Sequence, residues 1–227
     1  MSRNRSLLLL LVYGMVATLA IFYGLVERQS LFVTFVAFHL LVCLGIPLLH
    51  GWREGKLAAH WRAAWGVYDT RGARFGLILG LIQMVGVMSG IWLLLRTEGR
   101  AEEIRAILQN WGLHGGWLGL FALYLIIVNS LLEELMWRGF VLQRLQQVMS
   151  RPAAIMLSSL FFSLYHFIIV SVLFNPLWGV FLTALVFGAG VLWAWMKSMF
   201  PSVYPTWFSH MLVDVGIAAS VVWWIYR

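Results

Sequence analysis

The sequence predicts an all-α, polytopic membrane protein, and its composition and the spacing of its apolar residues carry that prediction. Hydrophobic residues make up 62% of the 227 positions and charged residues only 11%, whereas a soluble domain carries about 25% charged residues. The mean hydropathy is +0.86. The apolar residues gather in windows of about 20, the length that a helix needs to cross the hydrocarbon core of a bilayer. The length of the chain leaves no room for a separate soluble domain.

These windows predict about seven spanning helices (seven or eight if one piece is tilted or re-entrant), within a single integral membrane domain over residues 1–227. The predicted spans are 7–26, 31–50, 74–95, 116–140, 153–174, 177–198 and 203–225.

The basic residues predict the orientation of these spans. If the N-terminus lies inside, 11 of the 16 lysine and arginine residues fall in inward-facing segments, as the positive-inside rule requires. The sequence therefore predicts a cytoplasmic N-terminus. The net charge of +7 is explained in the same way, and we expect the lipid bilayer, not nucleic acid, as the partner of these residues.

Two connecting segments, 52–74 and 96–112, are predicted to form surface helices. In the first, Leu57, Trp61 and Trp65 recur every four residues among basic residues, a pattern typical of a helix in the headgroup layer. In the second, an apolar stripe that includes Ile104 lies opposite charged positions.

Small residues predict where helices approach closely. Gly76 and Gly80, then Gly86 and Gly90, form two Gly-x-x-x-Gly spacings in the third span, and we interpret both as packing surfaces. The single cysteine, Cys43, lies in an apolar run and is predicted to be a packed thiol.

The stretch Asn129–Phe140 places Glu133, Glu134 and Arg138 inside an apolar span. A charged side chain at the bilayer centre costs at least about 2.5–3.5 kcal/mol, so each needs a reason to be there. Glu134 and Arg138 are four residues apart and are predicted to form an ion pair. Glu133 points about 100° away and has no obvious local partner, which makes it the candidate for chemistry.

Two later spans supply further polar groups. The fifth contains Phe162-x-x-x-His166 and the seventh contains His210-x-x-x-Asp214, in which the carboxylate lies one turn from the imidazole. By contrast, we expect His39 to be a packed residue. His50, His60 and His114 lie near span ends, where solvated imidazoles are ordinary.

A carboxylate beside two imidazoles can deprotonate water, stabilise an oxyanion and protonate an amine leaving group, the three roles of peptide hydrolysis. Two histidines and a carboxylate also suit zinc with an open water position, although the His-Glu-x-x-His spacing is absent. No cofactor is therefore certain, and Zn²⁺ is an alternative with His166, His210, Glu133 and Asp214 as its candidate ligands. No Gly-x-Ser-x-Gly elbow occurs, and Cys43 has no nearby base. The sequence therefore does not favour a serine or cysteine peptidase.

The motifs Glu133-Glu134-x-x-x-Arg138, Phe162-x-x-x-His166 and His210-x-x-x-Asp214 resemble those of the CPBP family of intramembrane proteases. That family includes the type II CAAX prenyl endopeptidases, the Rce1-like proteins, and abortive-infection relatives. The order, the spacing and the placement on separate helices all match, and the resemblance covers a protease core of approximately 115–225.

The resemblance implies a role for each matched residue. Glu133 corresponds to the glutamate that activates the hydrolytic water, and His166 and His210 to the two essential histidines. Asp214 completes the catalytic set at a position where many members carry asparagine, and an ionised aspartate cannot donate to an oxyanion. The residues Glu134, Arg138, Phe162 and Asn129 are expected to support the catalytic set. Both metal-dependent and glutamate mechanisms have been argued within the family.

The leading hypothesis is an intramembrane endopeptidase that cuts a membrane-anchored or prenylated-like protein or peptide near the cytoplasmic face. We expect a multi-pass protein of a bacterial inner membrane whose partner is this embedded substrate. The alternatives are a proton-coupled transporter, which would also bury carboxylates and histidines, and a non-catalytic immunity or scaffold protein. The oligomeric state does not follow from the sequence.

Overall fold

The computed structural model describes residues 3–227, so Met1 and Ser2 of the predicted single domain lie outside the described residues. Of the described residues, 87% are helical, and none lies in a strand. Seven helices are long and apolar enough to span a membrane, which confirms the predicted fold class and count. The spans are Asn4–Glu27, Leu31–Arg53, Thr70–Glu98, Gly115–Leu145, Arg151–Leu173, Pro176–Met199 and Tyr204–Ile225.

The chain divides into two compact units. Unit 1 comprises residues 1–67 and 132–203, and unit 2 comprises residues 68–131 and 204–227. The fourth span crosses the boundary through α8 (Ser130–Glu134). The two glutamates of the first motif therefore belong to unit 1, and Asn129 belongs to unit 2.

The first two spans form a hairpin in unit 1. Helix α1 (Arg3–Phe22) ends in the π-helical η1 (Tyr23–Glu27). The second span runs through α2 (Leu31–Thr34), the π-helical η2 (Phe35–Gly45) and α3 (Ile46–Arg53). Ser30 caps this span, since its hydroxyl accepts from the Val33 N–H at 3.3 Å. Helix α1 packs on η2 and on the fifth span.

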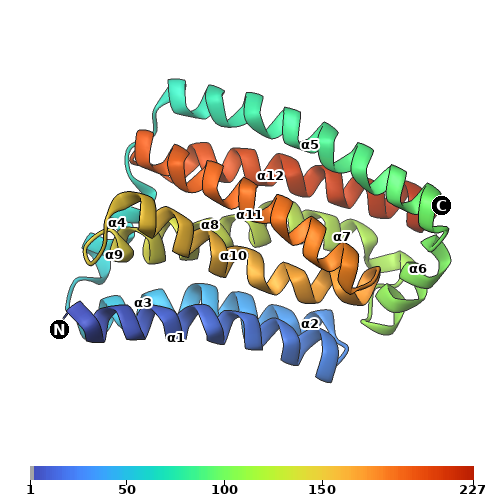
Figure 1. Cartoon of the computed structure of the whole chain (residues 1–227), viewed down its shortest axis with the longest axis horizontal. Helices are drawn as coiled ribbons and strands as arrows, with labels where there is room; N and C mark the ends of the chain where they lie inside the picture. Colours follow the sequence, from blue (N-terminus) through green and yellow to red (C-terminus); the bar gives the residue numbers. More distant parts are fainter. Residues whose placement is uncertain (1–2) are drawn as a thin grey trace. The chain divides into compact units, whose positions relative to one another are not determined.

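The remaining spans of unit 1 carry the motif residues. After α8 come the π-helical η5 (Leu135–Val141) and α9 (Leu142–Leu145), then α10 (Arg151–Leu173) and α11 (Pro176–Met199). Asn175 caps α11 by accepting from the Trp178 N–H at 3.0 Å, and Pro176 stands at the first helical turn, where a missing N–H costs nothing. Helices α10 and α11 pack along each other (Figure 1).

The predicted surface helix at 52–74 is confirmed as α4 (Leu57–Trp65), and its C-terminal carbonyls are held by other segments of unit 1. The Ala63 carbonyl accepts from Gln143 at 3.1 Å and the Ala64 carbonyl from Lys197 at 3.0 Å. The Trp65 carbonyl accepts from the Ser202 hydroxyl at 2.9 Å. These bonds satisfy carbonyls that have no partner within a helix and fix α4 over η5, α9 and the end of α11.

Unit 2 contains α5 (Thr70–Glu98), α6 (Ala101–Asn110), the 3₁₀ turn η3 (Gly115–Trp117), α7 (Leu118–Leu123), the π-helical η4 (Tyr124–Asn129), α12 (Tyr204–Ser220) and the π-helical η6 (Val221–Ile225). Helix α6 is the predicted surface helix at 96–112. Its Ile104 is buried, whereas Glu102 is exposed. The Arg105 guanidinium holds α6 against η6 by donating to the Ile225 carbonyl.

Helix α5 packs along α12, and half of the glycine prediction is confirmed there (Figure 1). A Cβ at Gly76 would collide with the Pro205 backbone, and one at Gly80 would lie 2.8 Å from the Ser209 Cα. Gly86 and Gly90 have no described atom within 4 Å of a Cβ position. The second Gly-x-x-x-Gly spacing is therefore not a packing surface within the described chain, because its two glycines meet open space.

Candidate active site

The predicted ion pair between Glu134 and Arg138 is present and deeply buried. Arg138 Nη1 lies 3.0 Å from Glu134 Oε1, and the side chains are 1% and 0% exposed. Arg138 also donates to the Gly190 carbonyl at 3.3 Å, and its guanidinium lies 4.3 Å from the centre of the Phe162 ring. A buried pair with these further partners holds η5 to α10 and α11, as expected of a supporting element.

Glu133 has tertiary partners that its own helix does not supply. The Tyr165 hydroxyl of α10 donates to Glu133 Oε2 at 2.9 Å. His39 Nε2 of η2 lies 3.9 Å from Glu133 Oε1, and both of these side chains are buried. These partners come from helices far away in the sequence, so local spacing does not reveal them. The expectation for His39 is confirmed as to burial, but its position beside Glu133 was not foreseen.

His166 lies on the same turn of α10 as Tyr165. The two rings stack with their centres 4.5 Å apart. His166 Nδ1 lies 2.9 Å from the Phe162 carbonyl oxygen, and a carbonyl only accepts hydrogen bonds. Nδ1 therefore carries the proton in the neutral ring, and Nε2 keeps the lone pair that a base or a metal ligand needs.

Phe162 links the first two motifs physically. Its ring lies against the Arg138 guanidinium on one side and has its centre 5.0 Å from that of His166. Its carbonyl fixes the tautomer of His166. The spacing Phe-x-x-x-His therefore positions the histidine twice, once through the ring and once through the backbone.

The third motif lies in unit 2. His210 Nε2 is 3.8 Å from Asp214 Oδ2 across one turn of α12. The Asn129 amide donates to the same Asp214 oxygen at 3.0 Å. His210 and Asp214 are both buried, and the Asn129 amide orients the Asp214 carboxylate.

The structure therefore assembles the predicted residues in two groups. Unit 1 brings together Glu133 and the α10 turn that carries His166, with Glu134, Arg138 and Phe162 behind them. Unit 2 brings together His210, Asp214 and Asn129. Within each unit, the described residues contain no group of three His, Cys, Asp or Glu side chains suited to a metal ion. The convergence of Glu133, His166 and His210 at about 4–8 Å, which shared use of one water requires, stays a prediction.

Sequence reasoning missed Tyr165 and the position of His39. Tyr165 precedes His166, and a phenol in an apolar span normally finds a hydrogen-bond partner when buried. That rule alone could have indicated a hydrogen-bonding role for Tyr165 from the sequence. Cys43 is buried, as predicted.

A second polar cluster lies at the end of unit 1 where the chain begins. The Arg144 guanidinium donates to both oxygens of Glu54, at 3.2 and 3.0 Å, and His50 Nε2 donates to Glu54 Oε1 at 3.0 Å. The bond from Arg144 is the main cause that lowers the pKa of Glu54 to about 2. Burial, followed by the positive charge of Arg144, lowers the pKa of His60. The expectation of simply solvated imidazoles is therefore wrong for His50 and His60, which join this network through Glu54.

Seven apolar helices in the described residues define the class of this protein, an integral multi-pass membrane protein. Residues 115–216 match the family described as type II CAAX prenyl endopeptidase Rce1-like. This Rce1-like segment contains all three motifs, so the recognition from the sequence is confirmed, and the match supports a CAAX-type protease. No curated protein and no solved structure matches the chain.

Proposed function

We propose that this protein is an intramembrane endopeptidase in which Glu133 activates the water that attacks a peptide bond. The observation that carries the proposal is the setting of Glu133, a buried carboxylate in an apolar span, oriented by the Tyr165 hydroxyl and neighboured by the turn that carries His166. Burying such a group is costly, and structural support for the helix is already supplied by the Glu134–Arg138 pair.

The proposed reaction is a hydrolysis. Glu133 takes a proton from water as the water oxygen bonds to the peptide carbonyl carbon, which gives a tetrahedral oxyanion. The C–N bond then breaks, and the proton held by Glu133 passes to the leaving amine, so that a carboxylic acid and an amine are formed; the acid then gives its proton to the amine, which yields a carboxylate and an ammonium. The Tyr165 hydroxyl, which donates to Oε2 of this carboxylate, is assigned to hold the base in place.

The histidines are assigned to the water and the oxyanion. The lone pair of His166 Nε2 makes it a hydrogen-bond acceptor for the attacking water, since Nδ1 donates to the Phe162 carbonyl. His210 of unit 2 is assigned to the developing oxyanion, to which a protonated or Nε2–H imidazole donates. Asp214 lies within reach to stabilise the imidazolium.

Asn129 supplies the amide that the third motif lacks. Asp214 stands where many members of the family carry asparagine, and a carboxylate accepts hydrogen bonds only. The Asn129 amide lies 3.0 Å from this carboxylate and carries two N–H donors. We assign it to orient Asp214, which in turn lies beside His210.

A zinc ion is the alternative way to activate the water. The donor types fit, because two histidines and a carboxylate with an open position form a common catalytic zinc set. His166 Nδ1 donates to the Phe162 carbonyl, and the ring nitrogen of a ligating histidine that does not bind the metal usually makes such a bond. His166, His210 and Glu133 would hold the ion, with Asp214 as ligand or partner, and the ion would polarise the water as a Lewis acid.

Metal analysis separates the two mechanisms. One zinc per purified chain that is lost in His210→Ala assigns the metal role. Full peptidase activity after exhaustive chelation assigns the glutamate mechanism.

We propose that the substrate is a membrane-anchored or prenylated-like protein or peptide, presented near the face on which the N-terminus lies. The positive residues at that end of unit 1 favour the cytoplasmic side under the positive-inside rule. A bacterial inner membrane is the proposed location, where no prenylated substrate is required.

The test is the variant Glu133→Gln, which keeps the size of the side chain and removes the base. Membrane peptides are compared by mass spectrometry between cells that carry the wild type, this variant and the control Glu102→Gln, whose side chain is 80% exposed on α6. The proposal expects cleaved peptides with the wild type and the control, and their uncut precursors with Glu133→Gln. Cleavage by Glu133→Gln at the wild-type rate would overturn it. Loss of solute uptake without any peptide product would favour a transporter.

A further inference from the structure

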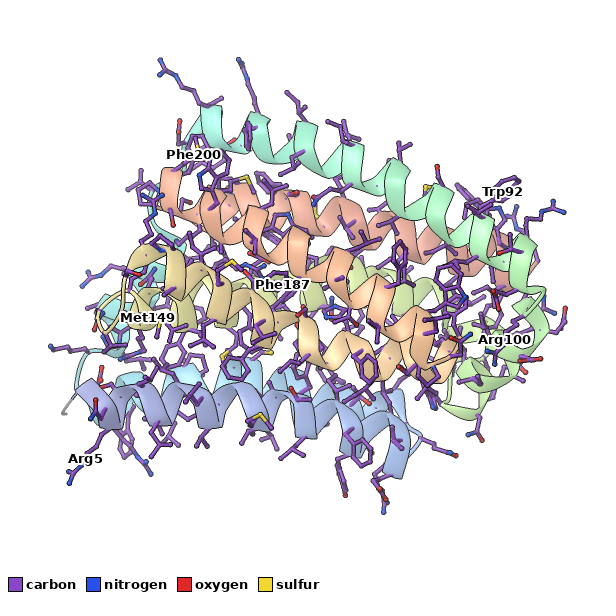
Figure 2. The ribbon with its side chains drawn as sticks, viewed as in Figure 1. Arg5, Trp92, Arg100, Met149, Phe187 and Phe200 are labelled. Carbon is purple, nitrogen blue, oxygen red and sulfur yellow. The ribbon has the colours of Figure 1, made fainter. Side chains whose placement is uncertain are left out.

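An open cavity of about 550 Å³ lies in unit 1, away from the candidate active-site residues. It is framed by α9, by the start of α10 and by the end of α11. Met149 and Phe200 mark the adjoining turns in Figure 2, at the same end of unit 1 as Arg5. Its volume falls within the range of small-molecule sites, about 300–1,000 Å³. This is the end of unit 1 predicted to face the cytoplasm.

The wall of this cavity is cationic. Its eight described lining residues include Arg151 and Lys197 and no acid. Lys197 is 6% exposed, which is unusual for an ammonium group. An ammonium has three N–H donors, and the bond to the Ala64 carbonyl uses one of them. The buried charge of Glu134 is already matched by Arg138 at 3.0 Å, so Lys197 adds positive charge to this end of the bundle.

The other polar groups of the wall are fixed in place. Gln143 donates to the Ala63 carbonyl, and Gln146 donates to the Ser198 hydroxyl at 3.4 Å. Ser198 in turn donates to the Ala194 carbonyl at 3.0 Å. The cavity is therefore lined by oriented polar side chains.

A second, apolar hollow of about 430 Å³ adjoins the first at Arg151. It lies between α10 and α11 and is lined by Ile155, Met156, Val191 and Trp195, together with Arg151 and Pro152. Met156 is 49% exposed and Trp195 is 42% exposed. A cationic cavity thus continues into an apolar groove that runs along the spanning helices, and Arg151 belongs to both.

We propose that these two hollows form a binding site for an anionic glycerophospholipid. The phosphate would lie in the cavity between Arg151 and Lys197, and an acyl chain would lie in the groove against Met156 and Trp195. Charge complementarity favours this occupant, because basic pockets between spanning helices on the cytoplasmic side bind anionic headgroups. The order of the hollows, polar at the membrane edge and apolar toward its interior, matches the order of the parts of a phospholipid. The site is independent of the proposed proteolysis.

The test measures lipid binding to the purified full-length protein in detergent by native mass spectrometry. Phosphatidylglycerol is titrated against the wild type, against Arg151→Gln and against the control Arg62→Gln. Arg62 is an exposed base on α4 that does not line either hollow, so both variants remove the same charge from the same end. We expect Arg151→Gln to weaken phosphatidylglycerol binding roughly fivefold and Arg62→Gln to leave it unchanged.

Three further arms identify the ligand. Phosphatidylcholine, whose headgroup has no net charge, is expected to bind more weakly than phosphatidylglycerol. Inorganic phosphate is expected not to displace the lipid at matched concentration. The variant Met156→Ser is expected to weaken lipid binding without changing the response to inorganic phosphate. Equal losses in Arg151→Gln and Arg62→Gln would reduce the effect to surface charge and overturn the proposal. Equal binding of both lipids, or full displacement by inorganic phosphate, would overturn it as well.

Discussion

The Tyr165 hydroxyl of α10 donates a hydrogen bond of 2.9 Å to Glu133 Oε2 of α8, and the Tyr165 ring stacks on His166. One side chain thus connects the proposed base with the first proposed histidine. Tyr165 is a positioning residue in this arrangement, because it acts on the reacting water through Glu133. Glu133 and His166 belong to motifs that the sequence identifies, but Tyr165 itself belongs to none of them.

Tyr165→Phe removes this bond and keeps the stacked ring. Hydrogen bonds to charged groups contribute about 1.5–3 kcal/mol, so we expect kcat to fall roughly 10- to 100-fold while KM changes little. The pH dependence of kcat is expected to shift, since the carboxylate loses a donor. Steady-state kinetics on a peptide substrate across the pH range measure both effects.

The matched control for Tyr165→Phe is Tyr226→Phe. The Tyr226 hydroxyl donates to the Leu113 carbonyl in unit 2, so this change also removes one tyrosine hydrogen bond. We expect it to lower stability without moving the pH profile. An unchanged profile in Tyr165→Phe would show that Tyr165 serves the fold alone.

Replacing only one partner of the Glu134–Arg138 pair is expected to destabilise the protein more than replacing both partners. Arg138→Met strands a buried carboxylate, and breaking a buried pair costs about 3–5 kcal/mol. The double variant Glu134→Gln with Arg138→Met removes both charges, and we expect it to recover most of this loss. Unfolding in mixed micelles measures the three proteins. Arg100→Met, which breaks an exposed pair with Glu103, is the control and is expected to have little effect.

The network around Glu54 predicts how stability changes with pH. Since the bond from Arg144 lowers the pKa of Glu54 to about 2 in the folded protein, the ionised carboxylate stabilises the fold above its unfolded pKa of about 4.3. This stabilisation is lost as the pH falls from there toward the folded pKa. Glu54→Gln lacks it at every pH. We therefore expect the wild type to be more stable than Glu54→Gln at pH 7 and the difference to shrink below about pH 4, as measured by thermal unfolding. A constant difference over this range would contradict the assignment.

Local sequence spacing predicted the features that a single helix decides. The seven spans follow from apolar length, and the Glu134–Arg138 and His210–Asp214 neighbours follow from the four-residue period of a helix. Tyr165 and His39 were missed because their contacts with Glu133 join three separate spans, and no local period encodes which faces of those spans meet. The cationic cavity was missed for the same reason, since Arg151 and Lys197 are ordinary span-end bases in the sequence.

Two glycines of α5 offer a test of helix packing in unit 2, because Gly80 and Gly86 lie only six residues apart and have opposite surroundings. At Gly80 a new Cβ would lie 2.8 Å from the Ser209 Cα and 2.9 Å from Leu212 Cδ1. Backbone atoms cannot yield as a flexible side chain does, so α5 and α12 must separate. Overpacking of this kind costs about 1–3 kcal/mol, and we expect Gly80→Ala to lose that much unfolding free energy in micelles. At Gly86 no described atom lies within 4 Å of the new Cβ, and alanine is the better helix former. Gly86→Ala is therefore expected to be neutral or mildly stabilising, and an equal loss in both variants would mean that the first glycine pair does not set the distance between these helices.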